Sequence, residues 1–501
     1  MAVTGVGSSS LPTLQALTTM RSQLEDLQRQ LGSGLKSDTY SGLGLDRGLT
    51  VGLRSQLASI SGYQQSNTLV GVRLDMMQTA LTQFGTIAQQ AKSTIVQSQF
   101  TLNGNNQTID QANAKNVLDQ LLGTINTSVD GRFLFSGSDV TQPSVDTADH
   151  ILNGDGAKAG LKQLIAERNQ ADLGADGLGR LSVGSPSATA VSLTEDAAPP
   201  FGFKLASATT TIAGASVSGP TGSPASLTVD LGATNPNAGD TVKFSFKLPD
   251  GTTSDLTLTA TTASPPGPGQ FTIGATTTDT ANNLKAALTS GLQTLGSTQL
   301  AAASAVAAGN DFFNTDADHP PQRVAGSPPF YAATSLTDGT DANTVQWYTG
   351  DNATTDPRSS VTARADQSVT VSYGARANEE ALRSVVQSVA VFAATSFSGS
   401  SATNQTQYSA LQQRLGATLG GNPNQQKLSD IGAQLATAQT TLANAKDRQD
   451  QTNTTLQNLL QNVQGAPTEQ VAAQILTLQT SLQASMQTTA MMLKMSIINY
   501  M

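Results

Sequence analysis

The clearest structural signal in the sequence lies at residues 428–463, LSDIGAQLATAQTTLANAKDRQDQTNTTLQNLLQNV. Apolar residues recur there at alternating spacings of three and four, which is the heptad pattern of a helix with one apolar seam. The positions of this seam are Leu428, Ile431, Leu435, Ala438, Leu442, Ala445, Gln449, Thr452, Leu456, Leu459 and Val463. Only Gln449 and Thr452 interrupt it with polar side chains. The spacing therefore predicts a long helix that packs lengthwise against a second helix.

The N-terminal region repeats this spacing in two series, which Gly32-Ser33-Gly34 and a glycine-rich connector separate. The first series is Leu17, Met20, Leu24, Leu27 and Leu31, and the second is Ile60, Tyr63, Asn67, Val70, Leu74, Met77, Leu81, Phe84, Ala88, Ala91 and Ile95. They predict helices over residues 10–31 and 49–98. At 1.5 Å per residue the second helix would approach ~75 Å, so it requires a long partner.

A last helix is predicted after the break Gly465-Ala466-Pro467. Its apolar residues are Val471, Ile475, Leu478, Leu482, Met486, Leu493 and Ile497. Each end of the chain is thus divided into an outer and an inner helix. The inner pair can form a rod, while the short outer pair would order only when neighbouring subunits bury its exposed face. The alternative for any one of these helices is the core of an ordinary antiparallel bundle.

Between these ends the composition changes. Thr108 and Gln111 form a capping-box pattern, which predicts a third helix that ends near residue 128. Beyond Val140, glycine, proline, serine and threonine become dense and the helical period disappears. Alternating apolar residues on either side of Pro249-Asp250-Gly251 predict a β-hairpin, and Asp279 is a candidate cap for a short helix after it. The middle is therefore expected to hold small α+β modules.

Regular patterns return in the last third of the chain. We predict strands over residues 360–365 and 368–373, a helix over 378–397, a polar loop, and the start of the heptad helix at Asn422-Pro423. The predicted fold is mostly α at both termini, with long antiparallel coiled-coil helices and an inserted β-rich or α+β domain. The expected segments are 1–45 (outer helix and connector), 46–140 (rod), 141–357 (inserted surface domain), 358–465 (rod) and 466–501 (outer helix).

Composition excludes several classes of function. The formal net charge of −9 offers no basic field for nucleic acid. The chain has no cysteine and only two histidines, His150 and His319, so a metal site or a histidine relay is hard to assemble. It also lacks an apolar stretch long enough to span a membrane, and its first residues lack the features of a secretory signal. Export by a route that removes no signal would leave the same sequence.

Two motifs were considered for ligand binding. Residues 154–160, GDGAKAG, lack the spacing of either nucleotide-binding fingerprint. Asp311, Asp316 and Asp318 miss the turn glycine and closing glutamate of a calcium loop. Both segments are expected to be ordinary loops. The sequence predicts no enzyme, no cofactor and no metal.

The ends of the chain resemble bacterial flagellins. The similarity lies in Leu27–Lys36 with its Leu-Gly-Ser-Gly-Leu turn, Gly42-Leu43-Gly44-Leu45, Thr94–Ser98, Thr468–Val471 and the closing Met491–Met501. It covers about the first 140 and the last 140 residues. The resemblance implies a structural subunit that polymerises through its terminal helices into the extracellular flagellar filament, exported without signal cleavage. It implies as partners other copies of the chain, the flagellar export apparatus, an export chaperone, and the filament cap and junction proteins.

The residues expected to carry assembly are taken from the predicted seams. They are Leu17, Met20, Leu24, Leu27, Leu31, Val70, Leu74, Met77, Leu81, Phe84, Leu435, Leu442, Leu456, Leu459, Val463, Ile475, Leu478, Leu482, Met486, Leu493 and Ile497.

Two alternatives remain open. Residues 131–137, GRFLFSG, the segment Tyr348–Asp351 and the final Ile-Ile-Asn-Tyr-Met resemble more closely the hook–filament junction protein, a homologous relative of flagellin. The other alternative is a polymer-forming scaffold that displays a binding or enzymatic module in its middle region.

Overall fold

The computed structural model describes residues 10–104, 106–197, 199–421 and 424–498. The chain forms two compact units. The terminal unit comprises residues 1–70, 364–371 and 440–501, and the central unit comprises residues 71–363 and 372–439. The predicted class is confirmed, because long helices occupy both ends of the chain and the strands are concentrated in the middle.

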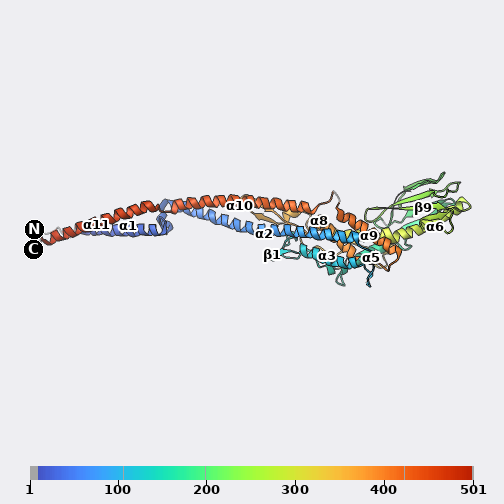
Figure 1. Ribbon diagram of the computed structural model, residues 1–501, viewed down its shortest axis with the longest axis horizontal. Coiled ribbons are helices and arrows are strands. Elements are labelled where there is room, and N and C mark those ends of the chain that lie inside the picture. The colour runs from blue at the N-terminus through green and yellow to red at the C-terminus, as the bar shows by residue number, and fades with distance from the viewer. Residues whose placement is uncertain (1–9, 105, 198, 422–423, 499–501) are drawn as a thin grey trace. The chain divides into compact units, whose positions relative to one another are not determined.

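In the terminal unit, helices α1 (Ser10–Ser33) and α11 (Thr468–Ile498) lie side by side (Figure 1). Leu24 and Leu27 of α1 pack against a small cluster formed by Ala466, Val471 and Ile475. A short 3₁₀-helix, η1 (Tyr40–Asp46), leads from α1 to α2 (Arg47–Gln97). The two outer helices predicted from the sequence therefore pair with each other.

Helices α2 and α10 (Leu428–Gln464) run antiparallel, and side-chain hydrogen bonds fix their register. In the terminal unit Arg54 donates to Gln464 at 3.2 Å and Gln64 donates to Asp450 at 2.7 Å. In the central unit Gln78 donates to Gln439 at 2.8 Å. Because the two residue numbers in each pair add up to nearly the same value, the register is constant, as the predicted antiparallel coiled coil requires.

The buried stripe of α10 departs from the predicted seam after Gln449. Up to that point the buried residues are the predicted ones, Ile431, Leu435, Ala438, Leu442 and Ala445. Beyond it Asn453 and Leu460 are half-buried, whereas Thr452 and Leu459 are exposed. The buried stripe here advances by four residues twice in succession, from 445 to 449 and from 449 to 453. Such a stutter compensates for the difference between the 3.6 residues of a helical turn and the 3.5-residue period of a heptad repeat.

The helical core of the central unit is built from α3 (Ile109–Ile125), α5 (Leu161–Leu173), α7 (Ala301–Phe313), α8 (Glu380–Ala394) and α9 (Ala402–Gly420), which pack against one another. Helix α8 is buried on nearly every face, and alanine, valine, leucine and phenylalanine make up most of its sequence, EALRSVVQSVAVFAA. The other short elements are β1 (Ser128–Val129), β2 (Arg132–Phe133), α4 (Ala148–Asn153), η2 (Gly296–Leu300), β11 (Gln322–Val324), η3 (Phe330–Ala332), β12 (Leu336–Asp338), η4 (Pro357–Ser360), β13 (Thr362–Arg364) and β14 (Thr370–Ser372).

Helix α9 corrects the prediction of a polar loop between the helix over 378–397 and α10. Most of its residues are glutamine, threonine and other polar types, so its apolar stripe is narrow. That stripe consists of Tyr408, Leu411 and Leu415, which are buried at helical spacing. Ser401 caps the helix by accepting from the backbone N–H of Asn404 at 3.2 Å. The predicted start of α10 at Asn422-Pro423 lies outside the described residues, and α10 itself begins at Leu428.

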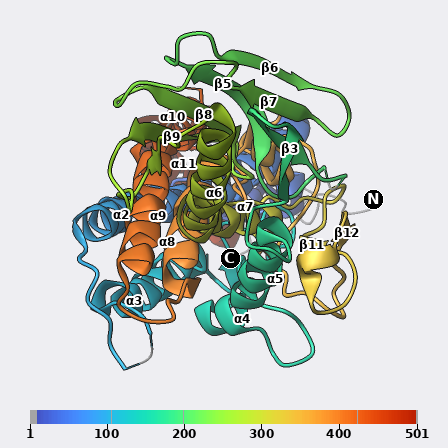
Figure 2. The same cartoon turned by 90° about the vertical axis from the view of Figure 1, so that its right-hand side faces the viewer.

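The β-rich module of the central unit contains two four-stranded sheets. One has the order β3 (Leu181–Ser187), β4 (Ala190–Glu195), β7 (Ser226–Asp230), β6 (Ser216–Thr221), and the other β10 (Gln270–Thr272), β9 (Thr253–Thr261), β8 (Thr241–Lys247), β5 (Lys204–Thr210). The predicted hairpin is β8–β9, paired from Thr241 with Thr259 to Lys247 with Thr253. Helix α6 (Thr277–Leu295) packs against both sheets (Figure 2).

The core of this module is largely aliphatic, and Phe203, Phe244, Phe246 and Phe271 are fully buried in it. The N-cap of α6 is Thr276 rather than the predicted Asp279, which instead completes a capping box at the third position of the helix. The two ends of the module meet, since the carbonyl oxygen of Gly177 lies 2.9 Å from the place where a Cβ on Gly296 would stand.

The predicted capping box of α3 is present. Thr108 Oγ1 accepts from the N–H of Gln111 at 3.1 Å, and the Gln111 side chain accepts from the N–H of Thr108 at 2.9 Å. We expect Thr108→Ala to lower the free energy of unfolding by about 1 kcal/mol, because an N–H in the first turn of α3 loses its acceptor. Urea unfolding followed by the fluorescence of Trp347, the single tryptophan, measures this change.

The matched control is Thr82→Ala on α2, whose exposed hydroxyl only donates to a carbonyl of its own helix. This control is expected to change the free energy of unfolding by less than about 0.5 kcal/mol. Equal changes in the two variants would contradict the capping role.

Candidate assembly surface

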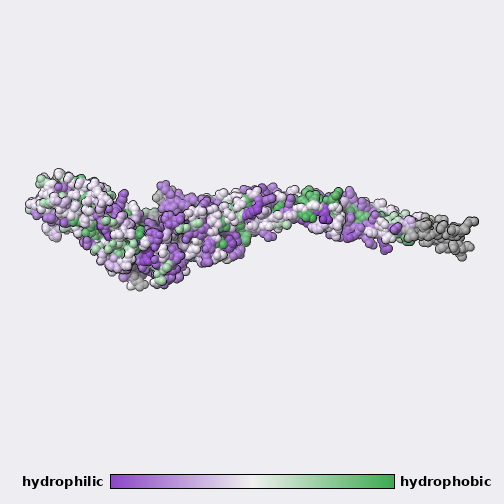
Figure 3. Space-filling model, turned by 180° about the vertical axis from the view of Figure 1, so that it is seen from behind, coloured by the Kyte–Doolittle hydropathy of each residue, from purple (hydrophilic) through white to green (hydrophobic). Residues whose placement is uncertain are grey.

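Exposed large apolar side chains are concentrated on the terminal unit. Among the described residues, 11 of the 16 such side chains belong to it, although it is much the smaller unit. They are Leu14, Leu31, Tyr40, Leu45, Leu49, Val51, Leu69, Leu459, Leu476, Met486 and Met491. In Figure 3 a hydrophobic patch (green) lies on the visible face of this unit. Clustered apolar surface of this kind marks a site of protein association.

The outer helix pair is apolar on more faces than the pairing uses. Leu17, Met20, Leu24 and Leu27 of α1 are half-buried. On α11, by contrast, Leu476, Met486 and Met491 are 65%, 52% and 62% exposed. A two-helix pair covers only one stripe of each helix, so these side chains remain available to a further protein surface.

The connector between α1 and α2 carries the most exposed apolar residue of the described chain. Leu45 is fully exposed, and Leu49 and Val51 at the start of α2 are about half exposed. Gly44 within η1 has φ of 56°, a left-handed conformation that an L side chain rarely adopts. The connector therefore turns at a glycine and presents leucine to solvent.

Hydrogen bonds tie this connector to the break between α10 and α11. The N–H of Ala466 donates to the carbonyl of Gly34 at 2.9 Å, and the N–H of Lys36 donates to the carbonyl of Gln464 at 2.8 Å. The Lys36 ammonium also donates to the carbonyl of Val463 at 2.9 Å. A cation at the C-terminal end of a helix interacts favourably with the unpaired carbonyls there. The two predicted helix breaks are thus one bonded junction.

The structure separates the predicted assembly residues into three groups. Val70, Leu74, Met77, Leu81, Phe84, Leu435, Leu442 and Ile475 are buried. Leu17, Met20, Leu24, Leu27, Leu456, Val463, Leu478 and Leu482 are half-buried. Leu31, Leu459 and Met486 are exposed. Leu493 and Ile497 belong to α11, but their side chains lie outside the described part of the chain.

Sequence reasoning missed Leu45, Leu49, Val51, Leu476 and Met491. All five fall outside the heptad series, so a search for helical seams passes over them. Their only signal in the sequence is that leucine, valine or methionine stands where a soluble helix pair would carry a polar residue. Such residues can be identified as exposed only once the packed face of each helix is known.

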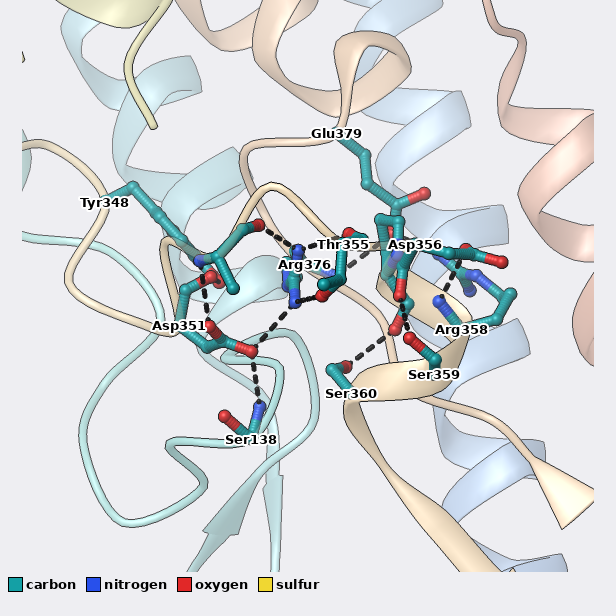
Figure 4. Close-up of polar contacts among 12 residues, drawn as sticks. Ser138, Tyr348, Asp351, Thr355, Asp356, Arg358, Ser359, Ser360, Arg376 and Glu379 are labelled. Atoms are coloured by element: carbon teal, nitrogen blue, oxygen red, sulfur yellow. Dashed lines mark hydrogen bonds and ion pairs between the residues drawn. The ribbon is translucent and has the colours of Figure 1, made fainter. Parts of the chain in front are cut away.

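In the central unit, two of the three segments that resemble the junction protein meet, and Figure 4 shows Asp351 beside Ser138, the residue that follows GRFLFSG. The N–H of Asp351 donates to the carbonyl of Ser136 at 2.9 Å, and the N–H of Gly137 donates to the carbonyl of Ala375 at 3.0 Å. A Cβ on Gly350 would stand 2.7 Å from the Ser136 carbonyl oxygen, so only glycine fits there. The GRFLFSG and Tyr-Thr-Gly-Asp motifs thus bring together segments more than 200 residues apart.

Arg376 occupies the centre of this cluster. Its guanidinium donates to Asp351 Oδ2 at 2.9 Å and to the carbonyl of Thr355 at 2.8 Å, and its backbone N–H donates to Glu379 at 3.0 Å. Glu379 in turn pairs with Arg358. Burial opposes ionisation of Asp351, but hydrogen bonds from two backbone N–H groups and the charge of Arg376 keep its pKa below the ordinary value. The groups bond chiefly to one another, which is typical of a structural cluster.

Each of the two histidines makes a local contact with an aspartate. His150 pairs with Asp146 at 3.2 Å and His319 with Asp316 at 2.8 Å, both as exposed local contacts. Within the described ranges no cluster of three or more metal-ligating side chains is present. The GDGAKAG segment folds tightly on itself, because a Cβ on Gly154 would stand 2.1 Å from the carbonyl oxygen of Lys158. None of the helices described here is both long and apolar enough to cross a bilayer.

Comparison with known proteins agrees with the helical fold of the N-terminal region. Residues 8–140 match the model of the bacterial flagellin N-terminal helical region, a segment that contains α1, α2 and α3. No curated protein matches the chain. Flagellins are a family of structural proteins. Over residues 8–140, about a quarter of its length, this chain is therefore similar to the bacterial flagellin family.

Proposed function

We propose that the chain is a subunit of the bacterial flagellar filament and polymerises through its terminal helices. The observation that supports this most is the concentration of exposed apolar side chains on the terminal unit of a single chain. Burial of such side chains against neighbouring copies contributes about 25 cal/mol per Å² of apolar surface. The inner α2–α10 pair, whose stripe is buried within one chain, is then the frame that folds first.

The family relationship extends this proposal to partners and location. Other copies of the chain are the main partner. The flagellar export apparatus, an export chaperone, and the filament cap and junction proteins are the others. The working location is the flagellum, outside the cell, and the central unit carries the surface-exposed inserted domain.

The second candidate function is that of the hook–filament junction protein. The observation that favours it is the Arg376 cluster, because this cluster joins two of the three segments that resemble the junction protein. Both candidates are structural subunits of the same organelle, so they differ in copy number and position rather than in chemistry.

Labelling on living cells distinguishes the two candidates. Because the chain has no cysteine, Ala263→Cys in an exposed loop of the central unit introduces a single thiol for a maleimide dye. We expect dye along the whole flagellar shaft, seen by fluorescence and electron microscopy. Dye confined to a short zone next to the hook would assign the junction protein instead. Absence of dye from flagella in cells that secrete the labelled chain would contradict both candidates.

A further inference from the structure

Asn67 and Gln449 are two of the buried polar side chains that α2 and α10 carry in the terminal unit. Asn67 on α2 is 5% exposed and Gln449 on α10 is 2% exposed. Asn67 Nδ2 donates to Gln449 Oε1 at 3.2 Å across the helix pair. Buried amides in a helix seam lower its stability unless they are hydrogen-bonded, so their other partners decide what they do.

Both amides converge on one backbone carbonyl of the segment 364–371, which we call the hairpin tip. The carbonyl oxygen of Ala365 accepts from Asn67 Nδ2 at 2.9 Å and from Gln449 Nε2 at 2.7 Å. Ala365 is fully buried, and its N–H donates to the carbonyl of Val369 at 2.8 Å, which closes the tip. The two side chains thus satisfy both lone pairs of a carbonyl that is remote from them in sequence.

The stutter of α10 falls at the same place. Gln449 stands between the two successive spacings of four, where the buried stripe moves from the line of Ala445 to that of Asn453. An apolar residue at this point would continue the packing between the helices but leave the Ala365 carbonyl with one donor, Asn67, instead of two. The buried stripe of α10 therefore changes its line at Gln449, the same residue that binds the hairpin tip.

We propose that Asn67 and Gln449 are positioning residues that hold the hairpin tip on the α2–α10 pair. This role goes beyond the proposed function, because it concerns how one chain fixes a strand segment and not how copies associate. Removal of a donor from a buried carbonyl is costly, whereas opening of the tip lets water satisfy that carbonyl. The two polar residues thus make the helix pair less stable than apolar residues would, but they hold the hairpin tip in place.

The test is the rate of tryptic cleavage after Arg364 in the full chain carrying Asn67→Leu and Gln449→Leu. Leucine suits a heptad seam, so the helical circular dichroism is expected to persist. Because Ala365 is buried, cleavage there requires the tip to open. Loss of two hydrogen bonds is expected to raise the cleavage rate about thirtyfold, which corresponds to about 2 kcal/mol. Cleavage at other arginines and lysines serves as the internal reference.

The matched control is Thr455→Leu, further along α10 at an exposed position whose hydroxyl donates to the Gln451 carbonyl of its own helix. It adds the same side chain to the same helix without touching the hairpin tip, so the cleavage rate after Arg364 should remain that of the parent chain. An unchanged rate in the double variant, or an equal rise in the control, would show that the proposal is wrong.

A second variant keeps the proposal testable if the double variant loses its helical signal. Gln449→Glu preserves the size of the side chain but removes the N–H donor at neutral pH. A nitroxide on Ser368→Cys, an exposed residue of the hairpin tip, reports the mobility of the tip by electron paramagnetic resonance. We expect a more mobile nitroxide than in the chain with Gln449. Equal mobility would overturn the proposed positioning role.

Discussion

A chain with Leu476→Ser, Met486→Ser and Met491→Ser is expected to fold and to lose the ability to form filaments. All three side chains lie on α11 and are more than half exposed in the single chain, so serine removes little packing within it. If neighbouring copies bury these side chains, the loss is about 3 kcal/mol or more per subunit, which raises the critical concentration about a hundredfold. Sedimentation of seeded polymerisation mixtures measures that concentration, and circular dichroism checks the fold.

The matched control places serine at exposed apolar positions of the other unit. Ile109 and Tyr331 are also exposed, at 63% and 45%, but they belong to the central unit. Ile109→Ser with Tyr331→Ser should therefore polymerise at the critical concentration of the parent chain. Filaments of normal length from the α11 variant at that concentration would refute assembly through the exposed face of α11.

The second large effect is expected from Arg376→Met. This change leaves the Asp351 carboxylate, which is 14% exposed, without the guanidinium that pairs with it. Loss of one partner from a buried ion pair typically costs about 3–5 kcal/mol. Trp347 is fully buried beside Tyr348 and donates to the carbonyl of Phe313 at 2.9 Å, so its fluorescence reports the unfolding of this region. Urea unfolding of the two chains at pH 7 measures the difference.

The dependence of this loss on pH is a further part of the same prediction. Because the pKa of Asp351 is lowered in the folded chain, its ionised form contributes stability that is present above the ordinary value of 3.8 and is lost as the pH falls through the lowered pKa. The difference between parent and variant should therefore shrink below pH 3.8. Arg29→Met serves as control, since its ion pair with Asp26 is more than half exposed and should contribute less than about 1 kcal/mol. Equal losses in the two variants would argue against a structural role of the Arg376 cluster.

The long helices of this chain could be predicted because heptad spacing is a local property of the sequence. The buried positions from Val70 to Phe84 and from Ile431 to Gln449 coincide with the predicted seams. After Gln449 the predicted Leu456 and Val463 are still half-buried, but Thr452 and Leu459 are exposed. The stutter that causes this difference depends on what packs beside the helix. Here the hairpin tip packs at that position, and the spacing of apolar residues around 445–453 does not indicate it.

The middle of the chain was harder to predict for a compositional reason. Strands such as β3, with the sequence LSVGSPS, and β6, with SVSGPT, carry serine, glycine and proline at positions where a strand search expects alternating apolar residues. They are stabilised by pairing with neighbours of the same sheet rather than by their own propensity. Only the β8–β9 hairpin has an apolar alternation strong enough to be recognised from sequence.

The assembly role of the seam residues stays a prediction. The seam residues identify which helices pair. About half of these residues pack inside the chain, as the burial of Leu74 and Leu435 shows. The residues left outside, such as Leu45 and Leu476, follow no period. Their exposure is a property of the connector and of the uncovered face of α11, which only the folded chain defines.

The adjacent ends of the β-rich module, at Gly177 and Gly296, bear on how this chain can change in evolution. When both ends of an inserted segment are held together, the entropy lost in closing it grows only with the logarithm of its length, by about 0.6 kcal/mol for each doubling. Residues between the two glycines can therefore be added or removed at small thermodynamic cost to the helices that flank them. In the proposed filament, an exterior of this construction can diversify rapidly while the interface between subunits stays under strict selection.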